Sequence, residues 1–67
     1  MDIKLNNQHT TLPDHFTLQQ LLDLVIPNTQ KGIAMAVNSM VIAKTEWDKH
    51  LLKNNDDVLI IKATQGG

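Results

Sequence analysis

Apolar and polar residues alternate at the start of the chain, and this pattern predicts a β-hairpin. Ile3 and Leu5 alternate with polar neighbours, which is the period of a strand with one buried face. Asn6 and Asn7 follow, and asparagine tolerates the positive φ angles of a tight turn. We therefore expect the chain to return as a second strand over residues 8–12.

The next segment has the period of a helix. Thr17 stands where an N-cap is expected, and Gln20 three residues later completes a capping-box pattern. Pro27 ends the helix, because proline is poorly tolerated beyond the first turn. The apolar residues that follow the i, i+3, i+4, i+7 spacing of one helix face are Leu18, Leu21, Leu22 and Val25. This face should lie on a sheet.

The second half of the chain predicts shorter elements. Residues 33–37 have the pattern of a third strand, and a turn at residues 38–39 leads into a short strand over residues 40–43. Thr45 is expected to cap a single helical turn. The apolar residues that we assign to the core in this region are Trp47, Leu51 and Leu52.

The last predicted strand follows a turn at residues 54–56 and runs from Asp57 to about Thr64. The order β-β-α-β-(short β)-β, with a helix that can serve as a crossover, implies a mixed sheet wrapped over one main helix. We therefore expect an α+β protein with a β-grasp (ubiquitin-like) fold. Its domain should span residues 1–64, and residues 65–67 should form a flexible tail.

Composition excludes several classes of chemistry. The 67-residue chain has 42 % hydrophobic and 19 % charged residues, as a folded domain does, but a domain of this size has little room for an internal active site. It has no cysteine, so a disulfide framework, a thiolate nucleophile and a sulfur-ligated metal are excluded. A net charge of −1, with six lysines and no arginine, disfavours nucleic-acid binding.

No pattern in the chain predicts export or membrane insertion. The first six residues lack the basic and apolar regions of a signal peptide. No segment approaches the roughly 20 apolar residues that a membrane-spanning helix needs. We therefore expect a cytoplasmic protein.

Few side chains suggest catalysis or metal binding. His9, His15 and His50 fall on a predicted strand, a loop and a short helix, without the spacing of a metal-ligand set. Asp56 and Asp57 are adjacent at a strand start and so point to opposite faces, which favours local hydrogen bonding in a turn over a catalytic pair. We expect no catalytic residue, no metal site and no bound cofactor.

The final strand carries apolar residues on both faces, although one helix can cover only one face of the sheet. If Val58 and Ile60 face the helix, then Leu59, Ile61 and Ala63 form an exposed apolar stripe that leads toward the tail. This stripe is a candidate docking surface for partner proteins. The reverse parity and self-association are the alternatives.

A set of short motifs, each weak alone, keeps one order and spacing across almost the whole chain. The set comprises residues 1–6, 17–22, 36–38 and 56–58, Val41, Trp47, and Gly66-Gly67 at the end. In this combination the chain resembles the ubiquitin-like sulfur carrier proteins, and most closely the ThiS family of thiamine biosynthesis. One departure is Asn55, where that family usually has glycine, although asparagine also tolerates a left-handed backbone.

The resemblance implies a function for the end of the chain. In such carriers a ubiquitin-activating-like (ThiF-like) adenylating enzyme uses ATP and magnesium to adenylate the terminal carboxylate, which here belongs to Gly67. Sulfur from a donor such as a cysteine desulfurase then makes a thiocarboxylate, from which a ThiG-like thiazole synthase forms the thiazole. Gly66 and Gly67 lack a Cβ and so suit entry into a narrow enzyme channel. The chain would be a protein co-substrate and not an enzyme.

Other functions remain compatible with the same fold. The MoaD-like carriers of molybdopterin synthesis are typically longer and have prolines before their Gly-Gly tail, whereas residues 62–65 contain none. A ubiquitin-like modifier would instead join its terminus to lysines of other proteins. A non-covalent β-grasp interaction domain would leave its terminus unmodified.

Overall fold

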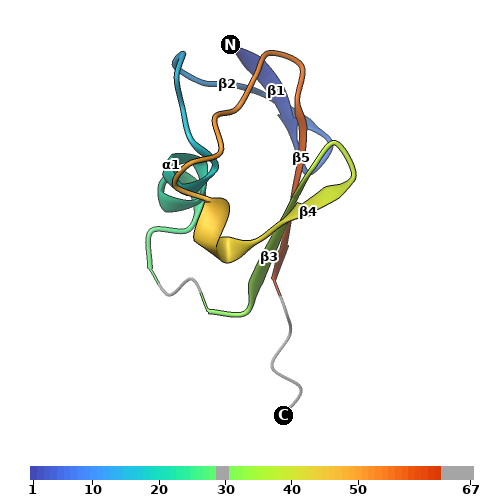
Figure 1. Cartoon of the computed structure of the whole chain (residues 1–67). Helices are drawn as coiled ribbons and strands as arrows, with labels where there is room; N and C mark the ends of the chain where they lie inside the picture. The colour runs from blue at the N-terminus through green and yellow to red at the C-terminus, as the bar shows by residue number, and fades with distance from the viewer. Residues whose placement is uncertain (29–30, 63–67) are drawn as a thin grey trace.

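The computed structural model describes residues 1–28 and 31–62, and Figure 1 shows their arrangement. Along these residues the elements are β1 (Asp2–Leu5), β2 (Gln8–Thr11), α1 (Leu18–Val25), β3 (Ile33–Val37), β4 (Met40–Ile42), the 3₁₀ turn η1 (Lys44–Glu46) and β5 (Asp57–Lys62). This is the predicted order of elements. Within the described ranges, no helix is both long enough and apolar enough to cross a membrane.

The five described strands form one mixed sheet in the order β2-β1-β5-β3-β4. The last strand, β5, occupies the centre, where it runs parallel to β1 and antiparallel to β3. Helix α1 connects β2 to β3, which lie on opposite sides of the β1–β5 pair, and it covers one side of the sheet (Figure 1). This arrangement confirms the predicted β-grasp fold.

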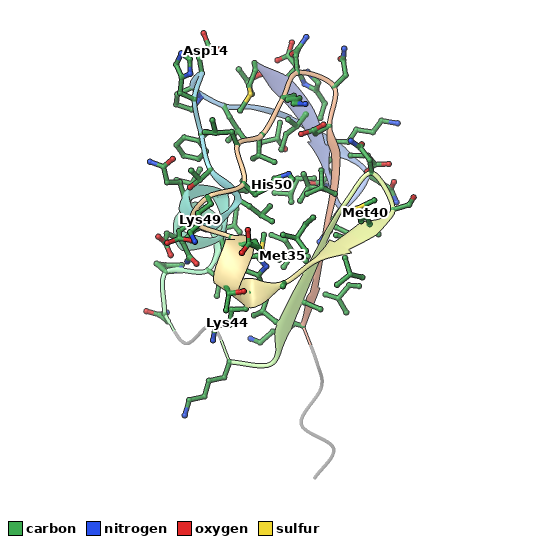
Figure 2. The ribbon with its side chains drawn as sticks, in the orientation of Figure 1. Asp14, Met35, Met40, Lys44, Lys49 and His50 are labelled. Carbon is green, nitrogen blue, oxygen red and sulfur yellow. The ribbon has the colours of Figure 1, made fainter. Side chains whose placement is uncertain are left out.

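The hydrophobic core lies between α1 and the sheet. The predicted capping box starts the helix: Thr17 Oγ1 accepts a hydrogen bond from the Gln20 amide at 3.1 Å, and Gln20 Oε1 accepts one from the Thr17 amide at 2.8 Å. Met35 of β3 is fully buried and points from the sheet toward the helix side (Figure 2). The other fully buried large side chains are Ile3, Leu18, Leu21, Leu22, Trp47 and Val58.

Residues with positive φ angles form the tight turns, as the sequence predicts. Asn6 and Asn7 connect β1 to β2 with φ angles of 49° and 67°, and Asn38 and Ser39 connect β3 to β4 with φ angles of 50° and 70°. Asn55, before β5, has a φ angle of 72°. Asparagine adopts this left-handed region more readily than most residues, so the turn tolerates the replacement of glycine.

Three predictions about local structure are wrong. Leu51 is 52 % exposed while Leu52 is buried, because adjacent residues of an extended segment point to opposite sides. Val25 is exposed at the last position of α1, and the following Ile26 packs against the core instead. Thr45 lies inside η1, whose N-cap is Ala43 and makes no side-chain capping bond.

Two other predicted features differ in extent. His50 follows η1 in an irregular segment instead of lying in a short helix. The described part of β5 ends at Lys62, so the predicted extension to Thr64 and the domain boundary at residues 64–65 lie outside the described residues.

Candidate functional site

The two faces of β5 have opposite environments. Val58 is fully buried and Ile60 is half-buried against the core, whereas Leu59 is 41 % exposed and Ile61 is 53 % exposed on the other side. Of the two parities that the sequence left open, the structure therefore has the one in which Val58 and Ile60 face the helix. Within the described ranges no helix or strand covers this second side of the sheet, which we call the outer face (Figure 1).

Strand register shows which residues share the outer face with Leu59 and Ile61. Ala36 lies opposite Leu59 and Ala34 lies opposite Ile61 in the β3–β5 pair, and directly opposed residues of antiparallel strands point to the same face. Val41 lies opposite Ala36 in β4 and is 72 % exposed. We call these five residues the outer patch. Ala36 itself is buried, because the larger side chains of Leu59 and Val41 flank it on both sides.

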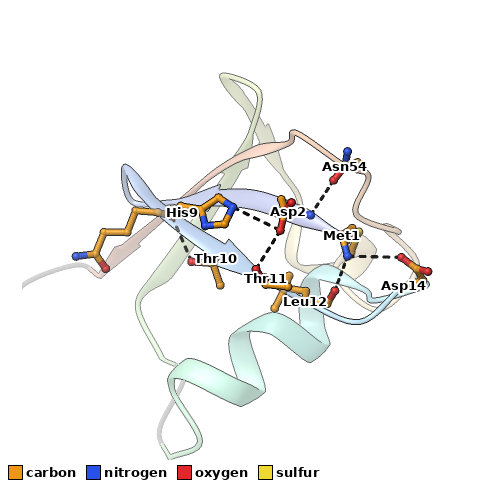
Figure 3. A network of polar contacts seen from close by, with 9 residues as sticks. Met1, Asp2, His9, Thr10, Thr11, Leu12, Asp14 and Asn54 are labelled. Atoms are coloured by element: carbon orange, nitrogen blue, oxygen red, sulfur yellow. Dashed lines mark hydrogen bonds and ion pairs between the residues drawn. The ribbon is translucent and has the colours of Figure 1, made fainter.

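The other half of the outer face, over β1 and β2, is polar. Asp2 Oδ1 accepts a hydrogen bond from Thr11 Oγ1 at 3.0 Å and lies 3.4 Å from His9 Nε2, as Figure 3 shows. Lys4 pairs with His9 in register and so points to the same face. An open hollow of about 370 Å³ lies here, and the residues that line it are Asp2, Ile3, Lys4, His9, Asn55 and Asp57. The outer face is therefore divided into an apolar half and a charged half.

The first residues of the chain are held at the end of the sheet from which β5 begins. The Asp2 amide donates to Asn54 Oδ1 at 2.7 Å, and the terminal amine donates to the Leu12 carbonyl at 2.7 Å (Figure 3). The terminal amine also lies 3.6 Å from Asp14 Oδ1. Since β5 runs parallel to β1, Lys62 lies at the opposite end of the sheet.

The candidate acid-base residues have structural roles or lie apart. Asp56 is buried, and its carboxylate accepts hydrogen bonds from the Lys53 amide at 2.8 Å and from Asn38 Nδ2 at 3.0 Å. This confirms the prediction of local hydrogen bonding in a turn. Among the described residues there is no group of three or more His, Asp or Glu side chains arranged to hold a metal ion.

The reactive end of the predicted site falls outside the described residues. Gly66 and Gly67, and the third residue of the predicted stripe, Ala63, all lie beyond Lys62. The structure describes β5, the strand that leads into them. Leu59 and Ile61 lie on this strand, and Ile61 directly precedes Lys62. β5 thus carries two residues of the outer patch and ends, in its described part, at the residue that precedes Ala63.

Sequence reasoning did not place Ala34 and Val41 beside Leu59 and Ile61. Their strands were predicted, but their place beside Leu59 and Ile61 depends on the β3–β5 and β3–β4 pairings. The available signal was the alternation in residues 33–37, which assigns the alanines to the face opposite Met35. Pairing partners are not encoded in that alternation.

Comparisons with known proteins agree with this architecture. The family model "ThiS family" matches residues 2–67. The Escherichia coli (strain K12) "Sulfur carrier protein ThiS" is 27 % identical over 67 residues, with all of both chains covered. A crystal structure of a thiamine biosynthesis protein (ThiS) from Geobacter metallireducens has a TM-score of 0.85 at 19 % identity, with full coverage of both chains. An NMR solution structure of a thiamine biosynthesis protein from the same organism has a TM-score of 0.81 at 20 % identity, covering all of this chain and 88 % of that one.

Proposed function

The chain belongs to the ThiS family, and from this membership we propose that it is a sulfur carrier protein that supplies sulfur for thiazole formation in thiamine biosynthesis. The observation that carries the proposal is the family match over residues 2–67, which includes Gly66 and Gly67. The E. coli relative, named as a sulfur carrier protein, supports it because the two chains align over their full lengths.

The proposed reactive group is the C-terminal carboxylate of Gly67. A carboxylate is a poor acyl donor, because its oxygen is a poor leaving group. A ThiF-like enzyme, using ATP and magnesium, joins the carboxylate to AMP and releases pyrophosphate. The terminal sulfur of a persulfide on a donor such as a cysteine desulfurase then attacks the activated carbonyl and AMP leaves. A thiol reductant cleaves the disulfide bond of the resulting acyl disulfide, and the thiocarboxylate is released. Gly66 and Gly67 let the chain enter the enzyme channel because neither carries a Cβ.

In this proposal the protein is a co-substrate and holds no cofactor of its own. The outer patch, which includes Leu59 and Ile61, is the docking surface for the ThiF-like adenylating enzyme and the ThiG-like thiazole synthase. Ala63, which lies outside the described residues, is a further candidate for this surface. Exposed apolar residues that gather on one face are typical of protein–protein interaction sites. Continuity along β5 would place a docked partner next to the tail that it must modify.

Mass spectrometry of protein made together with its activating enzyme and a sulfur source tests the proposal. A mass gain that matches replacement of one oxygen by sulfur, at Gly67, is the expected result. Conjugates on lysine residues of other proteins would instead identify a ubiquitin-like modifier, and an unchanged mass would favour a non-covalent interaction domain. Transfer of the sulfur to a purified thiazole synthase reaction, and not to molybdopterin synthesis, identifies the pathway.

A Gly67→Val variant is the matched control for this measurement. The added side chain should block adenylation for two reasons. It restricts the φ and ψ angles that residue 67 can adopt, and it makes the segment that must enter the channel bulkier. The fold should be unchanged, since the residues that form the hydrophobic core and pack against it lie between Met1 and Ile60. A Gly67→Val protein that is adenylated at the normal rate would contradict the proposed role of the tail.

A further inference from the structure

The side chain of Asn6 binds the backbone of β5 close to the tail. Asn6 Oδ1 accepts a hydrogen bond from the Ile60 amide at 2.8 Å, and Asn6 Nδ2 donates one to the Ile60 carbonyl at 3.3 Å. The Asn6 amide also donates to the Val58 carbonyl at 2.9 Å. One residue therefore makes three hydrogen bonds to the central strand.

These bonds extend the β1–β5 pairing beyond the end of β1. The paired residues of the two strands end at Leu5 and Val58, because the chain turns away after Leu5 into the β1–β2 hairpin. The Ile60 amide and carbonyl point away from β3, toward the side of β5 where β1 no longer pairs with it. An asparagine side chain carries one amide donor group and one carbonyl acceptor, as a backbone peptide does, so Asn6 replaces the missing strand at Ile60.

The residue type and the backbone geometry at this position fit the role closely. Asn6 sits at a φ angle of 49°, a left-handed conformation that asparagine tolerates and that most other residues disfavour. Aspartate has the same length but offers only acceptors when ionised, so it can bind the Ile60 amide and not the carbonyl. Glycine keeps the turn and removes both side-chain bonds.

A second asparagine holds the other end of β5 in a similar way. Asn38, the first residue of the β3–β4 turn, donates its amide to the Asp57 carbonyl at 2.8 Å and accepts from the Asp57 amide through Oδ1 at 2.9 Å. The first residues of both hairpin turns thus bind the backbone of β5, from opposite sides. Asn38 holds the start of the strand, whereas Asn6 holds it two residues before Lys62.

We propose that Asn6 is a positioning residue, which fixes the last part of β5 and thereby the direction in which the tail leaves the sheet. The inference rests on the proposed carrier function, because the tail is the segment to be positioned. Asn6 acts through β5 and does not touch the reacting carboxylate. Without its side chain, the end of β5 from Ile60 to Lys62 is held by β3 alone, so the point from which the tail departs is less firmly fixed.

The test compares Asn6→Gly with Asn7→Gly. Both residues have positive φ angles in the same turn, and the Asn7 side chain makes no hydrogen bond among the described residues, so Asn7→Gly reproduces the backbone effect alone. In the free protein, hydrogen exchange at the Ile60 amide should be about tenfold faster in Asn6→Gly than in Asn7→Gly, the effect expected for the loss of its hydrogen bond. Unchanged exchange at Ile60 would overturn the inference.

Adenylation kinetics, measured well below the unfolding temperature, separate positioning from a purely structural role. For Asn6→Gly we expect kcat to fall by roughly three- to tenfold, because the carboxylate is less often in line for reaction. KM for the carrier should stay within about twofold of the wild-type value, since the outer patch is untouched. Asn6→Asp, which keeps the bond to the Ile60 amide, should fall between wild type and Asn6→Gly.

Faster exchange at Ile60 with an unchanged kcat would show that Asn6 serves the fold alone, and would overturn the positioning role while leaving the carrier function intact. Failure of the carrier function itself gives a different result, because the wild-type protein would then form no thiocarboxylate in the presence of the activating enzyme and a sulfur source. The two failures are therefore distinguishable in one set of assays.

Discussion

The two faces of β5 are equally apolar, yet one builds the fold and the other is left open. Val58 and Ile60 on the inner face pack into the core, whereas Leu59 and Ile61 on the outer face remain in contact with solvent. Hydropathy does not distinguish the two pairs. The difference comes from topology, because the helix of the described domain covers one side of the sheet only.

The outer face also shows that the apolar residues of the outer patch are not a general property of the exposed side of this sheet. Its other half, over β1 and β2, is built from Asp2, Lys4, His9 and Thr11, as an exposed sheet surface usually is. Apolar side chains are concentrated on the half that adjoins the tail segment. This contrast within one surface is the reason that we propose the outer patch as the docking surface for partners.

The largest effect on folding is expected for the inner face. Val58→Ala removes the two buried methyl groups of the valine side chain and leaves a cavity. The free energy of unfolding should therefore fall by about 2–3 kcal/mol. Chemical denaturation measures this quantity. A loss below about 0.5 kcal/mol, the range typical of surface substitutions, would contradict the role of the inner face of β5 in stabilising the fold.

The outer face should respond in the opposite manner. Ile61→Lys places a charge at the centre of the outer patch, so affinity for the adenylating enzyme, measured by calorimetry, should fall by about tenfold or more. The free energy of unfolding should change by no more than about 0.5 kcal/mol.

Leu24→Lys provides the control for Ile61→Lys. Leu24 is 62 % exposed on α1, so it is an apolar residue at least as exposed as Ile61, on a different part of the surface. Its substitution should leave partner affinity unchanged. If both variants, or neither, lost affinity, the outer patch would not be the docking surface.

The smallest effect is expected at the helix N-cap. Thr17→Ala removes the side-chain oxygen that accepts from the Gln20 amide, and the free energy of unfolding should fall by about 1 kcal/mol. Partner affinity at a temperature well below unfolding should be unchanged. Reduced affinity in this variant would mean that stability and docking are coupled, and that Ile61→Lys cannot be interpreted by its position alone.

The sequence predicted the fold where a local signal determines it. The capping box at Thr17 and the asparagine-containing turns act over a few residues, and all appear in the structure. Leu51 was misplaced because two adjacent leucines carry no alternation, so their pattern does not indicate which of them faces the core. Thr45 was misplaced because a residue with good capping chemistry is not enough to set the start of a helical turn.

The candidate site was predicted in part for a related reason. The alternation of β5 places Leu59 and Ile61 on one face, as predicted, but it does not indicate which face the helix covers, and the structure decides this. Val41 joins them only through β3, and Asn6 reaches Ile60 only because β1 and β5 are neighbours. Contacts between segments so distant in sequence depend on the topology of the sheet, which the periodicity of each strand does not specify.

The central claim is that partners meet the molecule on the outer face of β5, next to the tail, and not on the helix side. Titration of the unlabelled adenylating enzyme into ¹⁵N-labelled protein tests this most directly, since each backbone amide reports on its own surroundings. We predict that the signals that shift or broaden will be concentrated at Ala34, Val41, Leu59 and Ile61. Changes concentrated on α1, or on the charged half of the sheet around His9 and Thr11, would contradict the claim.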